Sequence, residues 1–139
     1  MKVAIISSGF LPVVDGVTIS VLRRVERLSR WGHDVLLFCP DYRAVSSFYP
    51  NWGDYSGGIL PGVRVVNLPS TRFVDQDFDR NVAPGSHRLV VRELERFRPD
   101  VIHVDEPERL FAGFLRIPGV GFARRTGTPC LSFYHTNFV

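Results

Sequence analysis

The densest cluster of reactive side chains follows an apolar run near the end of the sequence. Residues 130–134 read Cys-Leu-Ser-Phe-Tyr, and His135, Thr136 and Asn137 come directly after them. An imidazole can hold or move a proton near neutral pH, and the neighbouring hydroxyl and amide can bind a polar ligand. We therefore predict His135 as a catalytic residue and Thr136 and Asn137 as binding residues. The alternative for a lone histidine is a structural or solvated side chain.

Carboxylates gather after a second apolar run. The run at 101–104 is followed by Asp105, Glu106 and Glu108. Carboxylates at the end of a strand can bind hydroxyl groups, serve as a base, or cap the next helix. Both a functional and a capping role stay open for Glu106. For Glu108, a charge that complements the dipole of the following helix is favoured.

A long loop after the first apolar run ends at Gly16 and Val17, where helical periodicity begins. The free amides of a helix N-terminus attract anions, and a glycine lets a phosphate approach the backbone. We predict a diphosphate-binding role for Gly16 and Val17, against the alternative of a plain turn with Asp15 or Gly16 as the helix cap. The loop is neither a G-x-G-x-x-G nor a Walker A sequence, which disfavours a nicotinamide oxidoreductase.

These candidates need a scaffold of alternating strands and helices. Helical periodicity is clearest from Val17 to Trp31 and recurs at about 86–98, and 110–126 is predicted as a helix that Pro118 and Gly119 kink or split. The segments 41–62 and 69–85 read as irregular loops. Strands are predicted at 3–6, 35–39, 63–68, 101–104 and 130–134. Short strands that are apolar on both faces predict a doubly wound, mostly parallel α/β sheet of Rossmann-like type, with ligands beyond the carboxyl ends.

Composition limits the alternatives. The chain has 139 residues, of which 45% are hydrophobic and 22% charged, with a formal net charge of +3. These values suit one globular domain, and no run of like charge resembles a nucleic-acid-binding tail. No apolar run is long enough to span a bilayer, so we expect a cytoplasmic protein. Cys39 and Cys130 are expected as small buried hydrophobes and form no metal motif.

Four segments, taken in order, resemble the N-terminal domain of retaining GT-B glycosyltransferases of the GT4 group. They are 10–17 (FLPVVDGV), 28–35 (LSRWGHDV), 98–107 (RPDVIHVDEP) and 127–138 (GTPCLSFYHTNF). The group includes phosphatidylinositol mannosyltransferases and sulfoquinovosyltransferases. The resemblance implies that residues 1–139 form one Rossmann-like, acceptor-side domain, which we expect to be incomplete at its C-terminus.

The resemblance also implies roles for the candidate residues. Gly16 and Val17 would face the diphosphate of a nucleotide-sugar, and His135 would lie near the transferred sugar. Asp105 and Glu106 would line the acceptor side, and Thr136 and Asn137 would contact sugar or acceptor. Many relatives have two adjacent glycines where this chain has Asp15-Gly16. A carboxylate beside a diphosphate is unfavourable unless it points away.

In such relatives, a C-terminal domain holds the nucleotide with a basic pair and a Glu-x7-Glu motif. No Arg or Lys in this chain is an evident substitute for that pair. We therefore expect the complete enzyme to transfer a sugar from a nucleotide-sugar to an acceptor with retention, without a cofactor or metal. The 139-residue chain by itself is expected to be inactive.

Other readings stay open at this stage. One is a nucleotide-sugar epimerase with GT-B architecture, and another is a non-catalytic, standalone ligand-binding α/β domain. Arg23, Arg24, Arg27 and Arg30 in the first helix suggest a peripheral contact with the inner face of a membrane, against the alternative of a solvated helix surface. No nucleic-acid partner is expected.

Overall fold

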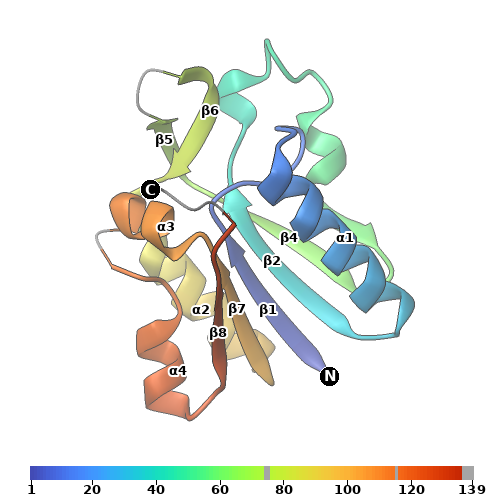
Figure 1. Cartoon of the computed structure of the whole chain (residues 1–139), viewed down its shortest axis with the longest axis vertical. Coiled ribbons are helices and arrows are strands. Elements are labelled where there is room, and N and C mark those ends of the chain that lie inside the picture. Colours follow the sequence, from blue (N-terminus) through green and yellow to red (C-terminus); the bar gives the residue numbers. More distant parts are fainter. Residues whose placement is uncertain (74–75, 115, 136–139) are drawn as a thin grey trace.

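The computed structural model describes residues 1–73, 76–114 and 116–135. A six-stranded sheet with the order β3-β4-β2-β1-β7-β8 runs through the molecule, and only β3 is antiparallel to its neighbour (Figure 1). The strands of this sheet are β1 (Lys2–Ser7), β2 (Asp34–Pro40), β3 (Gly57–Leu60), β4 (Val63–Leu68), β7 (Val101–Asp105) and β8 (Cys130–Phe133). The predicted doubly wound, mostly parallel α/β fold is confirmed.

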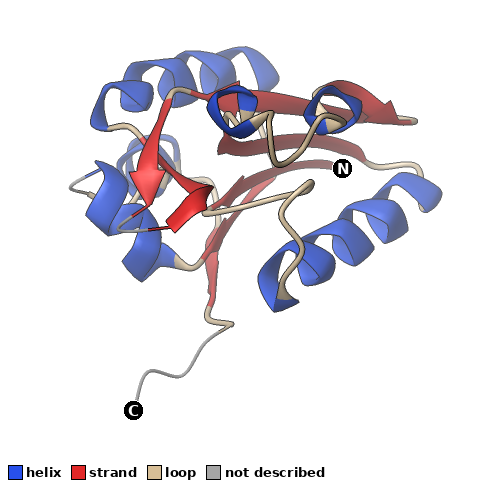
Figure 2. Ribbon diagram, turned by 90° about the horizontal axis from the view of Figure 1, so that it is seen from above, coloured by secondary structure: helices blue, strands red, loops and turns tan. Residues whose placement is uncertain are grey.

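Helices cover both faces of the sheet, and each face has its own apolar core (Figure 2). In β1, Val3 and Ile5 belong to the core under helix α1, whereas Ala4 and Ile6 belong to the core under the other helices. Successive side chains of a strand point to opposite faces, so a strand buried on both faces must be apolar at every position. This is why the strands appear in the sequence as continuous apolar runs.

Helix α1 (Gly16–Arg30) begins at a well-formed cap. The Asp15 carboxylate accepts a hydrogen bond from the Thr18 amide at 2.8 Å, and the Thr18 hydroxyl accepts one from the Asp15 amide at 3.0 Å. Such a reciprocal pair satisfies two backbone donors that the helix cannot. Val21 and Val25 lie one turn apart and are fully buried, which confirms the predicted apolar face there, whereas Trp31 at its end is 64% exposed.

The predicted helix at 110–126 is divided into α3 (Pro107–Phe114) and α4 (Val120–Thr126). Gly119 lies between them with a φ of 81°, and a Cβ atom there would come within 2.9 Å of the Ile6 side chain. Only glycine fits a left-handed conformation this close to the core. Helix α2 (His87–Phe97) lies on the same face as α3 and α4, and it contributes Val90 and Leu94 to their core.

The segment 41–62 is not the loop that the sequence predicted. It contains two short 3-10 helices, Arg43–Val45 and Trp52–Tyr55, and the edge strand β3. An aromatic side chain anchors the segment, because Tyr42 is buried and its hydroxyl accepts a hydrogen bond from the Phe10 amide at 3.1 Å. Burial raises the pKa of Tyr42 well above its ordinary value.

The second predicted loop, 69–85, is also wrong. It forms a separate two-stranded antiparallel sheet of β5 (Ser70–Phe73) and β6 (Gln76–Val82), followed by a 3-10 turn at Pro84–Ser86. The strands carry mostly polar side chains, so they lack the apolar run or the alternation that marks a strand in sequence. Cross-strand hydrogen bonding stabilises them instead.

The two cysteines are free, with Cys39 buried and Cys130 half-buried, and burial raises the pKa of both thiols. Within the described ranges, no group of three or more metal-ligating side chains comes together. Over the same residues, no helix combines the length and apolar character needed to cross a bilayer.

Candidate functional site

The carboxyl ends of three neighbouring strands bring the predicted site residues together. Ser7 at the end of β1 pairs with Asp105 at the end of β7, and Asp105 pairs with Phe133 of β8. The segments that follow these strands therefore meet at one edge of the sheet. They carry Ser8, Glu106 and His135, which is where ligands bind in doubly wound folds.

Asp105 is the most deeply buried carboxylate of this edge, with no exposed surface. Its two oxygens accept hydrogen bonds from the Arg24 guanidinium at 2.8 and 2.9 Å. Such a bidentate pair is the strongest form of arginine–carboxylate contact, and it offsets the cost of burying the charge.

Arg24 is available neither for a membrane surface nor as a solvated side chain, the two alternatives that the sequence offered. Its side chain is only 18% exposed, and its guanidinium lies 4.1 Å from the centroid of the Phe133 ring. A sequence signal was available, because residue 24 lies one helical turn after the buried Val21 and therefore borders the buried face. The partner of this charge is 81 residues away, so no local pattern predicts the ion pair.

His135 is held against the same carboxylate. Its Nε2 lies 2.6 Å from Asp105 Oδ1, and its side chain is 15% exposed. The predicted catalytic histidine is thus a partly accessible ring at a strand end. The predicted partners Thr136 and Asn137 lie outside the described residues.

His103 is a partly buried histidine. It lies on β7, with its ring 5.0 Å from that of Phe133 and its Nδ1 3.5 Å from an Arg24 nitrogen. Burial and the Arg24 charge lower the pKa of His103, and the Asp105 charge opposes them. A depressed pKa keeps this ring neutral beside the arginine.

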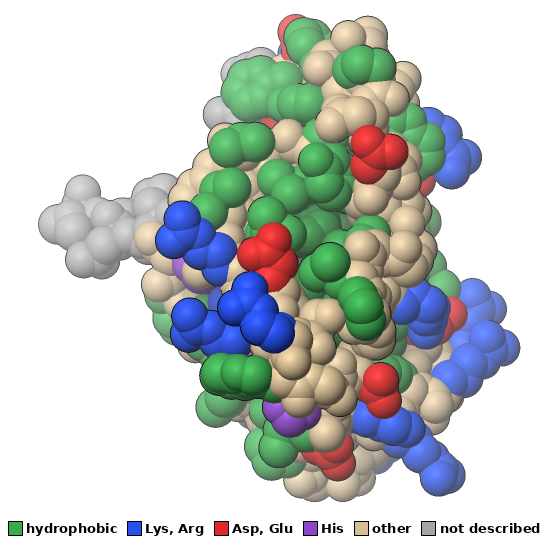
Figure 3. Space-filling view, turned by 90° about the vertical axis from the view of Figure 1, so that its right-hand side faces the viewer, with side chains coloured by type: hydrophobic (Ala, Val, Ile, Leu, Met, Phe, Trp, Pro, Cys, Tyr) green, Lys and Arg blue, Asp and Glu red, His purple; other side chains and the backbone are tan. Residues whose placement is uncertain are grey.

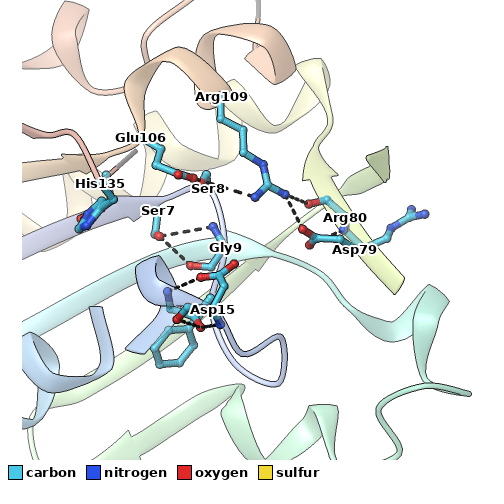
Figure 4. Close-up of polar contacts among 12 residues, drawn as sticks. Ser7, Ser8, Gly9, Asp15, Asp79, Arg80, Glu106, Arg109 and His135 are labelled. Atoms are coloured by element: carbon cyan, nitrogen blue, oxygen red, sulfur yellow. Dashed lines mark hydrogen bonds and ion pairs between the residues drawn. The ribbon is translucent and has the colours of Figure 1, made fainter. Parts of the chain in front are cut away.

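Glu106 occupies a tight backbone corner between β7 and α3, with a positive φ of 53°. Its side chain is buried, and its carboxylate accepts a hydrogen bond from the hydroxyl of Ser8, which is itself buried (Figure 4). Its amide donates to the Phe133 carbonyl at 2.9 Å. A side chain turned toward the β1 loop is placed to face a ligand there. Glu108 lies in the first turn of α3, where the dipole argument placed it.

Arg109 is a second residue that the sequence analysis missed. It donates hydrogen bonds to the Asp79 carboxylate and the Arg80 carbonyl, both at 3.0 Å (Figure 4). Its guanidinium also lies over the Phe73 ring, 3.9 Å from the centroid. One Arg109 nitrogen is 4.0 Å from the Glu106 carboxylate. This arginine therefore ties the β5–β6 hairpin to the site. No local sequence pattern predicts such a contact.

The N-terminus of α1 borders the site on another side. Figure 4 shows Asp15 and Glu106 on opposite sides of the Ser7–Gly9 segment. Gly16 is exposed, and a Cβ atom built on it meets nothing within 4 Å. The side chain of Val17 is buried in the core, so only its backbone amide is available for the predicted anion contact. The Asp15 carboxylate already accepts from the third helical amide, that of Thr18.

A pocket of about 410 Å³ opens beside His135. Figure 3 shows Lys and Arg side chains gathered on the face of the molecule that α1 occupies. The pocket is lined by Ser20, Arg23, Arg24, Arg27, Phe133 and His135. Guanidinium groups and an imidazole around one cavity can hold a ligand that combines negative charge with hydroxyl groups.

Comparison with known proteins decides the family. Residues 14–139 match the family model described as Glycosyltransferase Family 4. The chain belongs to Glycosyltransferase Family 4. The resemblance drawn from the four sequence segments is confirmed.

Similarity to curated relatives extends over nearly the whole of this family 4 chain. It is 35% identical over 137 residues to a GDP-mannose-dependent alpha-mannosyltransferase of Mycobacterium tuberculosis, covering 99% of this chain and 32% of that protein. It is 36% identical over 137 residues to the protein of the same name from Mycolicibacterium smegmatis, covering 99% and 33%. An alpha-monoglucosyldiacylglycerol synthase of Streptococcus pneumoniae is 24% identical over 138 residues, covering 99% and 27%. The chain thus spans about a third or less of the length of these relatives.

Proposed function

We propose that the complete gene product is a retaining glycosyltransferase, and that this chain is the acceptor-side domain of its GT-B architecture. The observation that carries the proposal is the placement of His135. In a chain of this family, a partly accessible histidine is fixed at the carboxyl end of β8, beside a cationic pocket. This edge of the sheet is where the fold binds ligands.

The donor we propose is a nucleotide-sugar, and GDP-mannose is the first candidate. Two of the relatives described above carry GDP-mannose in their names, at 35% and 36% identity. The proposal concerns the complete gene product, since the chain covers about a third of those proteins.

Asp105 has no exposed surface with which to line the acceptor side, and each of the other predicted site residues has a proposed task. The backbone amides of Gly16 and Val17 would meet the donor diphosphate, and His135 would contact the transferred sugar. Glu106, turned toward the β1 loop, would line the acceptor side. The assignment of Thr136 and Asn137 to sugar or acceptor stays a prediction.

Transfer also needs cations that stabilise the leaving diphosphate. We propose that a C-terminal domain of the same gene product supplies them across the cleft. Arg24 is committed to Asp105 and Arg109 to Asp79, so neither of these two arginines is free for that task. No metal or cofactor takes part in the proposed reaction.

We further propose a cytoplasmic location with peripheral contact at the inner face of the membrane. Arg23, Arg27 and Arg30 are exposed on α1 and remain available for anionic lipid, whereas Arg24 is not. The relative from Streptococcus pneumoniae, named for a glucosyldiacylglycerol product, makes a lipid acceptor worth testing.

The test is a donor panel on the complete gene product. We would incubate it with GDP-mannose, UDP-glucose or NAD in the presence of lipid and sugar acceptors, and analyse products by mass spectrometry. The proposal expects a glycosylated acceptor with the α-configuration of the donor retained, and no turnover by the 139-residue chain alone. Interconversion of the donor sugar without transfer would instead identify an epimerase. Donor binding without any product would favour a ligand-binding domain.

A further inference from the structure

We infer that Arg24 and Asp105 are positioning residues that hold His135 by its Nε2–H group, so that the ring offers Nδ1 to the substrate as a hydrogen-bond acceptor. The inference about the ring rests on geometry alone. Its consequence for catalysis rests on the proposed function.

Asp105 carries a negative charge, because it is paired with an arginine. Both of its oxygens accept from the Arg24 guanidinium, at 2.8 and 2.9 Å, and the side chain has no exposed surface. An arginine keeps its charge in proteins, and its planar fork matches a carboxylate. Asp105 is therefore bound as a carboxylate, which accepts hydrogen bonds and donates none.

The charge on Asp105 decides which nitrogen of the His135 ring carries the hydrogen. His135 Nε2 lies 2.6 Å from Asp105 Oδ1, a distance typical of a charge-assisted hydrogen bond. Because Oδ1 can only accept, Nε2 must carry the hydrogen. In a neutral imidazole with a hydrogen on Nε2, the lone pair is on Nδ1.

Arg24, Asp105 and His135 form a connected set that holds the ring in place. The three groups come from α1, β7 and the segment after β8, so all three elements must be in place before the ring is oriented. The Arg24 guanidinium lies 4.1 Å from the Phe133 ring centroid, which fixes the arginine from its other side. Residues locked by such supporting contacts keep a reactive group in its productive orientation.

The tautomer decides the direction of the hydrogen bond between His135 and a substrate. A neutral His135 would accept a hydrogen bond from a substrate hydroxyl through Nδ1, and it would not donate one. This suits a sugar or acceptor hydroxyl that points into the site, since every hydroxyl can donate. It disfavours contact with an oxygen that can only accept, such as a phosphate oxygen.

The direct test is the tautomer of His135. We would record long-range 1H–15N spectra of the uniformly 15N-labelled 139-residue chain at about pH 9, where an ordinary imidazole is neutral. The expected result is an unprotonated Nδ1 and a protonated Nε2. The opposite tautomer, or rapid averaging of both, would overturn the inference. Asp105→Asn should shift the resonances toward averaging, because an amide can either donate or accept.

The kinetic test uses the complete gene product. Asp105→Asn should lower kcat by at least about tenfold, because the wrong tautomer becomes accessible. The donor KM should change by less than about threefold, since Asp105 does not contact the donor directly. Arg24→Lys keeps the charge but loses the bidentate fork, so it should give a smaller loss of kcat and should still fold if Asp105→Asn does not.

The matched control is Glu95→Gln, which removes a carboxylate from an exposed pair with Arg125, far from His135 in sequence and on α2. It should leave kcat unchanged. A folded Asp105→Asn variant with the kcat of the control would overturn the positioning role. If the unmutated gene product transfers no sugar, the proposed function fails, and the tautomer measurement still decides the state of the ring.

Discussion

Asp15 occupies a place that a bound diphosphate would also favour. Its carboxylate caps α1 through the Thr18 amide, while the neighbouring Gly16 is exposed and has open space around its Cα atom. A diphosphate approaching the amides of Gly16 and Val17 would feel both the attraction of the helix N-terminus and the repulsion of the carboxylate. At the scale of the residue, the proposed donor binding at this place would be a balance between this attraction and this repulsion.

Gly16→Ala separates a ligand-contacting glycine from a merely structural one. No atom lies within 4 Å of the added methyl group, and alanine is the better helix former, so stability should not fall. The donor KM of the complete gene product should rise at least about fivefold, because the methyl group blocks close approach of a phosphate. Gly121→Ala in α4, with equally open space, is the control for both steady-state kinetics and thermal unfolding. An unchanged KM in the Gly16 variant would remove the residue from the site.

Asp15→Asn tests the repulsive term. Asparagine caps helices about as well as aspartate, so the free energy of unfolding should change by less than about 0.5 kcal/mol. Loss of the negative charge should lower the donor KM in low-salt buffer, with the effect fading as salt is raised. Asp15→Ala should cost about 1 kcal/mol in urea unfolding, because it loses the cap. A donor KM that is raised in the asparagine variant would show that the carboxylate helps binding.

At the scale of the element, the attachment of the β5–β6 hairpin to the rest of the molecule depends on Arg109. Arg109 holds the buried Asp79 and the Arg80 carbonyl, whereas the exposed Arg72–Asp77 pair lies within the hairpin itself. The side chains of Arg109 and Asp79 are 16% and 7% exposed, and those of Arg72 and Asp77 are 58% and 69% exposed. The two pairs provide a buried and an exposed case on one element.

Arg109→Ala should destabilise the chain by about 3 kcal/mol, because it leaves the Asp79 carboxylate buried without its cation. Arg72→Ala should change stability by no more than about 1 kcal/mol, since exposed pairs contribute little. Urea unfolding of both variants measures the difference, and hydrogen exchange should show loss of protection first in the hairpin. Equal effects of the two substitutions would contradict the anchoring role of Arg109.

The same contrast explains what the sequence could predict. Helices α1 and α2 have strong apolar periodicity because each buries one face, and the central strands are continuous apolar runs because they are buried on both faces. The hairpin and β3 have no apolar run or alternation that predicts a strand, since their stability comes from backbone pairing with the neighbouring strand. Asp105, Glu106 and His135 were found because strand ends mark ligand sites, whereas Arg24, Ser8 and Arg109 reach the site only through tertiary contacts.

At the scale of the whole molecule, stability is linked to pH through two histidines, His103 and His87, whose pKa values are lowered in the folded chain. Burial and the Arg24 charge lower the pKa of His103, and burial and the Arg116 charge lower that of His87. The folded pKa values thus lie below the ordinary 6.5 of the unfolded chain. The unfolded state binds protons first, so acid favours unfolding.

The stabilising contribution of these histidines is complete above about pH 6.5 and is lost as pH falls through their folded pKa values. The free energy of unfolding should therefore decline between about pH 7 and pH 5. In His103→Gln this decline should be shallower, because the variant has one titrating group fewer. Urea titrations across this range measure both slopes. Identical slopes for the two proteins would show that His103 does not contribute.

The central claim is that His135 at the end of β8 serves sugar transfer. The most direct measurement is the transfer rate of the complete gene product with His135→Ala, taken with its unfolding midpoint. We expect at least about a tenfold loss of transfer. We expect little loss of stability, because the ring is partly exposed and lies at the end of its strand. A folded variant that transfers sugar at the unmutated rate would contradict the account.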